Sequence, residues 1–445
     1  MDELLCPLAK HAALSPDSIA LIACDASWTY RQCDSIVRGL CLHLQNIKVK
    51  EKTRVAFIAH STPACVFLFF ALFRLRAIAC PLSFREPNEK ILQLIQALQD
   101  AGEESCLFID PQLLPLHPSS ARGPIPLCPG DLATCLFTSG TSGKSKIACH
   151  TLKNHWYSAL GVLDFFGLNA SSRWLLSLPL FHVGGLSILF RLFLAGGSVA
   201  LSALPLLSAL EKYAITHLSL VPTQLIRCLR DLPKEKALCH LQCTLLGGAS
   251  FSQALLEEAI KRGIPLFTTY GMTEMSSIIT AAKLPTSVHA GMPLAFRDCR
   301  LSADKEILVK GVPLFSGYWD ADAKTLTLPC VEEAWFATRD CGEFTQEGNL
   351  RITGRKDRLF ISGGENIQPE EIEKALCRIP GITFAVVVPI PDSEFGHRPI
   401  AYICDETNSH TLDSVREALS PLLPSFKHPI NIFPYVTKGS FKTCE

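Results

Sequence analysis

The sequence has no excess of charge of either sign. Its 445 residues contain 42 Lys and Arg against 42 Asp and Glu, so the formal net charge at pH 7 is zero. A nucleic-acid-binding domain usually carries a basic excess, and a disordered chain combines low hydrophobicity with high net charge. The balanced charge therefore predicts no nucleic-acid partner. The 48% of residues that are hydrophobic predict a large folded core, and the length of the chain predicts about three domains or subdomains.

The cysteines lack the paired spacing of zinc sites. None of the 19 is separated from another by only two residues, and the nearest pair, Cys239 and Cys243, has no second pair at zinc-site spacing. An odd number of cysteines, many of them within apolar runs, is typical of reduced core thiols. We therefore expect a reducing compartment and a cytoplasmic location.

A basic N-terminus and a long uncharged apolar run are also absent. The chain begins with the acidic segment Met1-Asp2-Glu3, unlike a signal peptide. Residues 65–73 are apolar but few, and residues 186–210 contain Arg191, whereas a membrane span needs about 18 uncharged apolar residues. We expect no integral membrane segment.

Short apolar runs alternate with helical patterns. Residues 55–59 and 132–137 read as buried strands, and residues 66–78 and 91–98 as helices. Strands that alternate with helices favour parallel sheets in an α/β fold. We predict a large N-terminal domain of mixed and parallel sheets with helices.

Three predicted strands each run into a polar segment. These segments are residues 138–146, 247–250 and 270–274. In parallel sheets ligands bind beyond the carboxyl ends of the strands, so we expect all three segments to face one crevice.

The pattern changes after about residue 300. Residues 342–354 read as a hairpin, and Pro369 with two following glutamates begins a helix. Further strands are expected at 384–388 and 400–404, with a helix from about Ser414. We predict domains at 1–356 and 357–445, the second small and α+β.

The segment 138–146 suits a polyphosphate. Its glycines allow close approach of backbone amides to an anion, and hydroxyls and lysines add donors and positive charge. A Walker A loop would need glycine where Thr138 stands, so that motif is excluded. The candidate ligands are Thr138, Ser139, Gly140, Thr141, Ser142, Gly143 and Lys146.

This segment resembles the TSGTTGxPK signature of the adenylate-forming superfamily, which includes acyl-CoA ligases, peptide-synthetase adenylation domains and luciferases. Similar matches follow in the family's order: 270–274 to YGxTE, 335–340 to YxTGD with Arg339 in place of glycine, 354–357 to GRxD, and 362–373 to the SGGENI-xPxEIE segment of acyl-CoA ligases. The resemblance implies a mobile C-terminal domain that rotates about a hinge at Asp357.

The resemblance also implies roles for individual residues. Thr273 would bind the α-phosphate of ATP, and Glu274 would bind Mg²⁺ as a catalytic and metal-ligating residue. Asp340 would accept the ribose hydroxyls, with Arg355 as a second ribose or phosphate contact. The other expected nucleotide contacts are Gly247, Gly248, Ala249, Tyr270 and Gly271.

The family's catalytic C-terminal lysine is displaced here. Ser440 stands at its position, and Lys438 and Lys442 lie two residues to either side. In an extended strand both project to the face of residue 440, so either can serve, and we favour Lys442. Gly364 belongs to the segment that would form the pantetheine tunnel.

Residues 178–191 and 219–225 resemble the o-succinylbenzoate–CoA ligase subgroup of menaquinone biosynthesis. Phe181 and His182 match the aromatic gate of the acyl pocket, although His182 also fits a buried core position. Arg191 lies in an apolar helical pattern, so its charge must be paired or hydrated. It meets either the aromatic carboxylate of succinylbenzoate or an internal acid.

The resemblance therefore predicts an enzyme that uses ATP, Mg²⁺ and coenzyme A to convert 2-succinylbenzoate to its CoA thioester. Two alternatives stay open. One is a general ligase for fatty or aryl acids. The other is a catalytically degenerate nucleotide-binding protein, for which Arg339 and Ser440 are the support. A homodimer is compatible with either.

Overall fold

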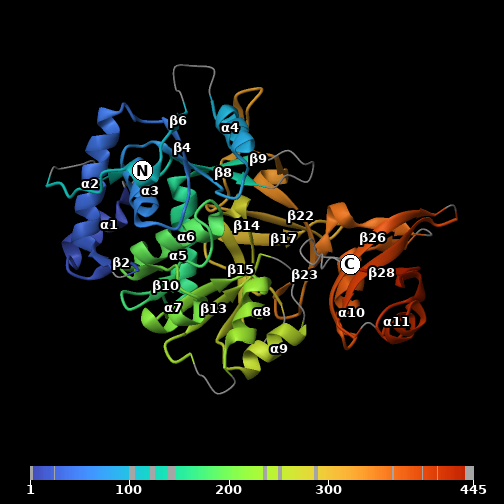
Figure 1. Cartoon of the computed structure of the whole chain (residues 1–445). Coiled ribbons are helices and arrows are strands. Elements are labelled where there is room, and N and C mark those ends of the chain that lie inside the picture. The colour runs from blue at the N-terminus through green and yellow to red at the C-terminus, as the bar shows by residue number, and fades with distance from the viewer. Residues whose placement is uncertain are drawn as a thin grey trace, which may run out of the picture.

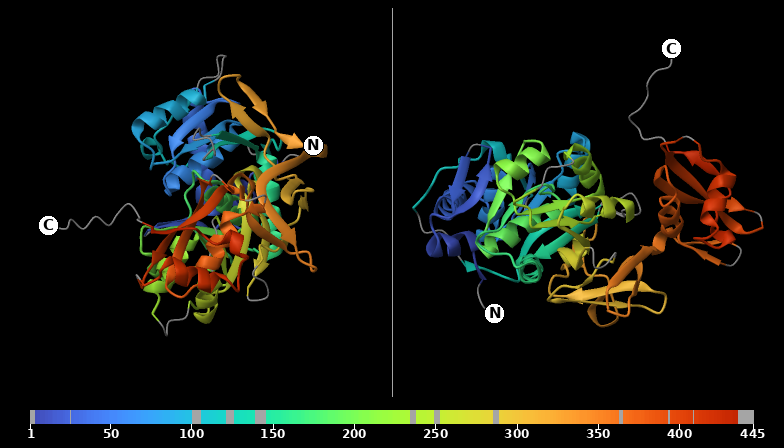
Figure 2. Two further views of the ribbon diagram at one scale, coloured as in Figure 1. Left: turned by 90° about the vertical axis from the view of Figure 1, so that its right-hand side faces the viewer. Right: turned by 90° about the horizontal axis from the view of Figure 1, so that it is seen from below.

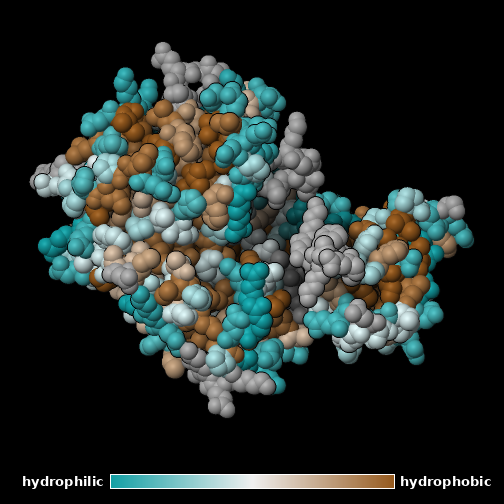
Figure 3. Space-filling view, in the orientation of Figure 1, coloured by the Kyte–Doolittle hydropathy of each residue, from teal (hydrophilic) through white to brown (hydrophobic). Residues whose placement is uncertain are grey.

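The computed structural model describes residues 4–24, 26–99, 106–120, 126–138, 146–233, 238–248, 253–284, 289–362, 365–392, 394–407 and 409–435. A large body contains most of the chain, and a smaller unit contains its C-terminal part (Figures 1 and 2). The surface is hollowed between the two on the face toward the viewer (Figure 3). Among the described residues, no helix is long and apolar enough to cross a membrane.

The largest sheet has nine strands and is parallel from β2 to β14, with antiparallel strands at both edges. Its strands, in spatial order, are β16 (Met292–Pro293), β15 (Ser277–Lys283), β14 (Leu266–Met272), β13 (Cys243–Leu246), β12 (His217–Leu220), β10 (Arg173–Leu175), β11 (Ser198–Leu201), β2 (Ile19–Ala23) and β3 (Ala26–Thr29). Its short apolar strands are almost fully buried, as expected for parallel strands covered on both faces.

Two groups of helices supply the cores that bury this sheet. The cores include residues of α1 (Pro7–Leu14), α2 (Tyr30–Asn46), α5 (Leu152–Phe166) and α6 (Val183–Ala195) in one cluster, and of α7 (Leu206–Lys212), α8 (Pro222–Asp231) and α9 (Gln253–Lys261) in another. The helix α6 is apolar around most of its circumference. Such a helix is buried on all sides, which places its one charged residue, Arg191, in the interior.

A second sheet has seven strands. In spatial order they are β20 (Thr325–Thr327), β19 (Gly317–Asp320), β9 (Lys146–Thr151), β8 (Leu132–Thr138), β5 (Ile78–Leu82), β4 (Arg54–Ile58) and β6 (Leu107–Phe108). The helices α3 (Pro63–Arg74) and α4 (Asn88–Ala97) contribute to separate hydrophobic clusters with its strands. Two short strands, β1 (Leu4–Leu5) and β7 (Pro126–Leu127), pair apart from it.

The remaining strands lead into the C-terminal unit. One sheet contains β17 (Arg297–Leu301), β18 (Glu306–Gly311), β22 (Trp335–Phe344), β21 (Cys330–Val331) and β23 (Leu350–Arg355). The C-terminal sheet contains β25 (Glu365–Ile367), β24 (Phe360–Ser362), β27 (Gly396–Asp405), β26 (Ile382–Asp392) and β28 (Ile432–Pro434), with helices α10 (Pro369–Leu376) and α11 (Leu412–Leu419). These elements form their own hydrophobic cluster.

The predicted α/β architecture is confirmed, with two corrections. The helix expected at 66–78 ends at Arg74, and Ile78 begins β5, because a left-handed residue, Arg76, turns the chain between them. The polar segments do not follow strands of one sheet. The strand before residue 138 belongs to the seven-stranded sheet, and those before 247 and 270 belong to the nine-stranded one.

Candidate active site

Asp340 lies at the centre of a hydrogen-bonded group between β14, β22 and β23. The hydroxyl of Tyr270 donates to Oδ2 of Asp340 at 2.7 Å, and Nη1 of Arg355 donates to Oδ1 at 3.0 Å. The strand register places Asp340 directly opposite Arg355. Burial raises the pKa of the Asp340 carboxyl, while the Tyr270 hydrogen bond and the Arg355 charge oppose this rise.

Arg355 is shared between two carboxylates. Its Nε and Nη2 atoms each donate to Asp357 at 3.1 Å, in addition to the contact with Asp340. The hydrogen bonds from Arg355 lower the pKa of the Asp357 carboxyl. Beyond this pair, the Gln368 amide donates to the backbone carbonyl of Arg355 at 2.8 Å and occupies the space that a Cβ at Gly354 would need.

Thr273 and Glu274 form a short 3₁₀ helix directly after β14. The Glu274 carboxylate is largely buried and accepts a hydrogen bond from the Tyr318 hydroxyl. The backbone carbonyl of Thr273 accepts a hydrogen bond of 2.7 Å from Nε2 of His150 on β9. Residues of the seven-stranded sheet thus position a turn that follows the nine-stranded sheet. The polar loop expected at 270–274 is wrong in its first part, because β14 extends through Met272.

The turn after Glu274 has an uncommon backbone. Ser276 and Ser277 have φ angles of 52° and 110°, which residues other than glycine rarely adopt. A Cβ at Gly271 would collide with the Ser277 backbone carbonyl. The glycine of this motif is therefore required by the close approach of β14 and β15.

The ends of the phosphate-loop candidate are described by the structure. Thr138 and Lys146 are paired across β8 and β9, and the Lys146 ammonium lies 4.8 Å from the centre of the Tyr318 ring. Lys146 is therefore beside the tyrosine that binds Glu274. The residues Ser139, Gly140, Thr141, Ser142 and Gly143 lie outside the described residues.

Gly247 and Gly248 follow β13, next to β14 in the sheet. A Cβ at Gly247 would collide with the Thr269 hydroxyl, and Gly248 has a φ of 81°. Both positions favour glycine for reasons of local geometry. Ala249, Gly364, Lys438 and Lys442 lie outside the described residues, so their placement stays a prediction.

Phe181 and His182 belong to a row of rings at the start of α6. The Phe181 ring lies 4.5 Å from the His182 ring and 5.5 Å from the Phe84 ring, measured between centres. The His60 ring stacks on the Phe84 ring, with 4.9 Å between centres. Phe181 is buried, whereas His182 is exposed. The row extends the predicted gate by two rings that the sequence did not indicate.

Arg191 is buried without an acidic partner among the residues that the structure describes. Its Nη2 donates to the Ser277 hydroxyl at 3.0 Å, and its guanidinium lies 5.5 Å from the Trp174 ring centre. Its Nε has no hydrogen-bond partner. Burial, with a contribution from nearby Arg297, lowers the pKa of Arg191 to about 9. The internal salt bridge considered from the sequence is therefore absent from the described part of the chain.

Arg191 and the nucleotide candidates are close in the fold. Ser277, which binds Arg191, begins the strand that follows Thr273 and Glu274. The predicted acid-binding and nucleotide-binding residues therefore meet at the start of β15. The contacts of His150, Tyr318 and Ser277 were missed from the sequence, because each depends on packing between distant segments.

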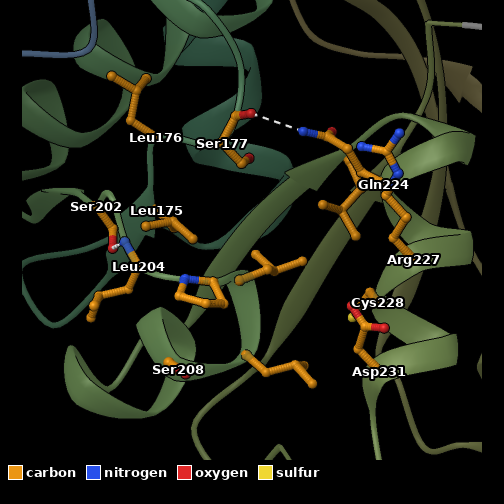
Figure 4. Close-up of a pocket in the computed structure, with 14 residues that line it drawn as sticks. Leu175, Leu176, Ser177, Ser202, Leu204, Ser208, Gln224, Arg227, Cys228 and Asp231 are labelled. Carbon is orange, nitrogen blue, oxygen red and sulfur yellow. Dashed lines mark hydrogen bonds between the residues drawn. The ribbon is translucent and has the colours of Figure 1, made fainter.

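A separate pocket of about 430 Å³ lies beside α7 and α8 (Figure 4). The amide of Gln224 donates to the backbone carbonyl of Ser177 at its rim. None of the predicted site residues lines this pocket. It is therefore distinct from the group around Asp340 and Thr273.

The described residues hold no cluster of three or more His, Cys, Asp or Glu side chains that could bind a metal alone. Mg²⁺ commonly binds one or two carboxylates together with substrate phosphates. Glu274, with one carboxylate oxygen held by Tyr318, fits that mode of binding.

The chain is similar to proteins of known family and activity. A family model described as AMP-binding enzyme matches residues 8–101 and 93–319. The chain is 37% identical to the 2-succinylbenzoate–CoA ligase of Salmonella typhimurium, over 86% of this chain and 83% of that protein. It is 34% identical to the Escherichia coli enzyme of that name, over 96% and 93% of the two chains.

Solved structures show the same similarity. The o-succinylbenzoate CoA synthetase of Bacillus subtilis in complex with the acyl-adenylate intermediate OSB-AMP has a TM-score of 0.87, 28% identity and coverage of 98% and 95% of the two chains. The same enzyme with ATP and a magnesium ion has a TM-score of 0.86, 28% identity and coverage of 98% and 96%. The chain therefore belongs to the family of AMP-binding enzymes.

Proposed function

We propose that the chain is an AMP-forming acid–CoA ligase that converts 2-succinylbenzoate to 2-succinylbenzoyl-CoA in menaquinone biosynthesis. One observation carries the choice of acid: Arg191 is a buried cation with no acidic partner among the described residues. Succinylbenzoate supplies a second carboxylate for this cation, whereas a simple fatty acid does not. The relatives with this activity support the same choice.

The first half-reaction joins the acid to AMP. A carboxylate oxygen attacks the α-phosphorus of ATP, the bond from that phosphorus to the pyrophosphate oxygen breaks, and pyrophosphate leaves. Thr273 binds the α-phosphate, and Asp340 with Arg355 binds the ribose or a phosphate. The segment 138–146 holds the pyrophosphate, and Gly247, Gly248 and Ala249 lie against adenine. Glu274 is the proposed ligand of Mg²⁺, which when bound would offset phosphate charge.

The second half-reaction transfers the acyl group to coenzyme A. The thiol sulfur attacks the acyl carbon, the bond to the AMP oxygen breaks, and the thiol proton is released. We propose domains at 1–356 and 357–445 with Asp357 as hinge, which the separate hydrophobic cluster of the C-terminal unit supports. Lys442, or alternatively Lys438, acts in adenylation, and Gly364 lines the pantetheine path.

Phe181 and His182 form the proposed gate of the acyl pocket. Arg191 lies nine positions after His182, which is about 13 Å along a helix at 1.5 Å per residue. The gate therefore stands at the N-terminus of α6, and the carboxylate-binding residue lies deep in the same helix.

We also propose a cytoplasmic location and a homodimer. All 18 cysteines within the described part of the chain carry free thiols, which suits a reducing compartment. Light scattering tests the assembly, because a monomer has a mass of 48.8 kDa and a homodimer has twice that mass.

The test of function is a pyrophosphate-release assay with ATP, Mg²⁺ and a panel of acids, followed by mass spectrometry with coenzyme A. We expect release with 2-succinylbenzoate and formation of its CoA thioester. Release with fatty or aryl acids alone would indicate the general ligase. No release with any acid would indicate a degenerate nucleotide-binding protein.

The variants Lys438→Ala and Lys442→Ala, assayed in parallel, identify the lysine that acts in adenylation. We expect the Lys442 variant to lose pyrophosphate release and the Lys438 variant to keep it. The reverse result would assign the role to Lys438.

A further inference from the structure

Arg339 has a backbone conformation that favours glycine. Its φ angle is 63°, in the left-handed region that costs an ordinary side chain of order 1 kcal/mol. The residue departs from the family's YxTGD pattern, in which glycine stands at this position. The conformation explains the glycine of the pattern, and it means that this chain retains arginine despite a local cost.

A bulge between β18 and β22 holds this conformation. The pairs Glu306–Cys341 and Leu308–Ala337 leave one residue, Ile307, opposite residues 338–340. The amide of Arg339 donates to Oε1 of Glu306 at 2.9 Å. Bulges often redirect a side chain next to a functional site. The bulge therefore fixes the backbone of Arg339 independently of its side chain.

The neighbours of the bulge are likewise anchored. The Thr338 hydroxyl donates to the Ile307 carbonyl at 2.8 Å, and the Asp340 amide donates to the Thr338 hydroxyl at 3.1 Å. The Lys356 ammonium lies 2.7 Å from Oε2 of Glu306. These contacts hold the backbone on both sides of Arg339 in place.

The Arg339 side chain is exposed, and within the described residues its guanidinium forms no hydrogen bond or ion pair. Arg355, by contrast, is neutralised by two carboxylates, Asp340 and Asp357. Arg339 is therefore a cation beside the ribose-binding candidate that is available to an incoming anion.

Arg339 directly precedes Asp340 on β22. Hydrogen bonds from Arg355 lower the pKa of the Asp357 carboxyl, and the charge of Arg339 adds to this lowering. Arg339 therefore stands beside the group formed by Asp340, Arg355 and Asp357.

We infer that Arg339 binds a phosphate group of ATP. The inference rests on the proposed function, and it assigns to this chain a cation that the family pattern lacks. An arginine suits phosphate oxygens, because its planar guanidinium can donate two parallel hydrogen bonds. The residue is a nucleotide-binding residue and takes no part in proton transfer.

Calorimetric titration of the full chain with ATP and with adenosine tests this inference. Arg339→Gly removes the cation and also relieves the backbone conformation. We expect the Kd for ATP to rise about tenfold, as for loss of a hydrogen bond to a charged group, with the Kd for adenosine unchanged and the melting temperature not lowered. Arg339→Lys keeps the charge and should lose less affinity for ATP.

Lys324→Gly is the matched control. Lys324 is also exposed with a positive φ of 54°, but it lies in the turn between β19 and β20, so both Kd values should stay at the parent level. An ATP Kd within twofold of the parent in Arg339→Gly, or an equal loss for adenosine, would overturn the inference. A parent chain that binds neither compound would overturn the proposed function itself.

Discussion

Nε2 of His150 donates a hydrogen bond of 2.7 Å to the backbone carbonyl of Thr273. The imidazole is fully enclosed and stacks on His155, with 4.9 Å between ring centres. The hydrogen bond joins the seven-stranded sheet to the turn proposed to bind the α-phosphate. A neutral imidazole with its proton on Nε2 satisfies the carbonyl. A second proton would place a buried positive charge on a ring whose Nδ1 has no hydrogen-bond partner among the described residues.

The stability of the protein should fall in mild acid. Burial lowers the pKa of His150 to about 4 from 6.5, so between these values the unfolded chain binds a proton that the folded chain excludes. Each such group reduces the free energy of unfolding by about 1.4 kcal/mol per pH unit as the pH falls through this window. Urea unfolding from pH 7 to 5 measures the slope.

The variant His150→Gln tests whether His150 causes this dependence of the free energy of unfolding on pH. The glutamine amide can still donate to the Thr273 carbonyl but does not titrate. We therefore expect the free energy of unfolding to depend on pH less steeply than in the parent, by about 1.4 kcal/mol per pH unit, which corresponds to one proton. His397→Gln is the control, because His397 is exposed. An unchanged slope in His150→Gln would contradict the assignment.

Arg191→Leu should weaken the binding of 2-succinylbenzoate without lowering the stability of the protein. We expect the KM for 2-succinylbenzoate to rise at least about 30-fold, since loss of one partner of a buried charge pair costs about 2–5 kcal/mol. The KM for ATP should stay near that of the parent. The melting temperature should not fall, because a buried charge without an acidic partner is removed. Unchanged turnover of succinylbenzoate would exclude the proposed role.

Arg297→Leu is a contrasting control for that experiment. Arg297 is also buried, but its guanidinium donates to the backbone carbonyls of Ala295, Ile278 and Ser158. Its removal takes these hydrogen bonds away, and a hydrogen bond to a charged group contributes about 1.5–3 kcal/mol. We therefore expect a lower melting temperature for Arg297→Leu than for Arg191→Leu.

Tyr318→Phe should weaken the binding of Mg²⁺ to the enzyme. The phenol holds one carboxylate oxygen of Glu274, and a hydrogen bond to a charged group contributes about 1.5–3 kcal/mol. We expect at least a tenfold rise in the Mg²⁺ concentration needed for half-maximal pyrophosphate release. Tyr213→Phe, whose hydroxyl donates to the Cys24 carbonyl, should show the parent's Mg²⁺ titration. If the two variants behave alike, Tyr318 does not position the metal ligand.

Tyr270→Phe should move the acid limit of ATP binding to higher pH. The Tyr270 hydroxyl stabilises the ionised form of Asp340 against the effect of burial, so its loss raises the pKa of that carboxyl further. Protonation removes acceptors for the ribose hydroxyls. We therefore expect the pH at which ATP affinity falls to be higher in the variant than in the parent. Kd values measured from pH 5 to 8 in parent and variant give the shift, and coincident curves would refute it.

The strand-to-helix pattern and the order of the motifs predicted most of the architecture, because each depends on residues close in sequence. The hairpin around Glu347 and the helix that begins at Pro369 were both confirmed. Apolar runs at 132–137 and 244–246 could not indicate which strands share a sheet, since that depends on contacts between segments far apart.

The candidate site, like the fold, could be predicted only in part from the sequence. Asp340 and Arg355 could be singled out from their motifs, and the structure brings them within 3.0 Å. Tyr318 and His150 could not, because a tyrosine or histidine alone carries no local signal, and their partners lie 44 and 123 residues away in the chain. The departure at Arg339 was visible in the sequence, but its φ angle was needed to show why the position matters.

Of the two carboxylates bound to Arg355, one belongs to the proposed hinge residue, Asp357, and the other, Asp340, lies in the N-terminal domain. A rotation about residue 357 that moves Asp357 away leaves Asp340 as the remaining carboxylate bound to Arg355. A nucleotide whose ribose binds Asp340 competes with Arg355 for that carboxylate. Such competition is reciprocal, because an effect of rotation on nucleotide affinity requires an equal effect of nucleotide on rotation. Binding of the ribose at Asp340 would then be coupled, through Arg355, to the rotation of the C-terminal unit.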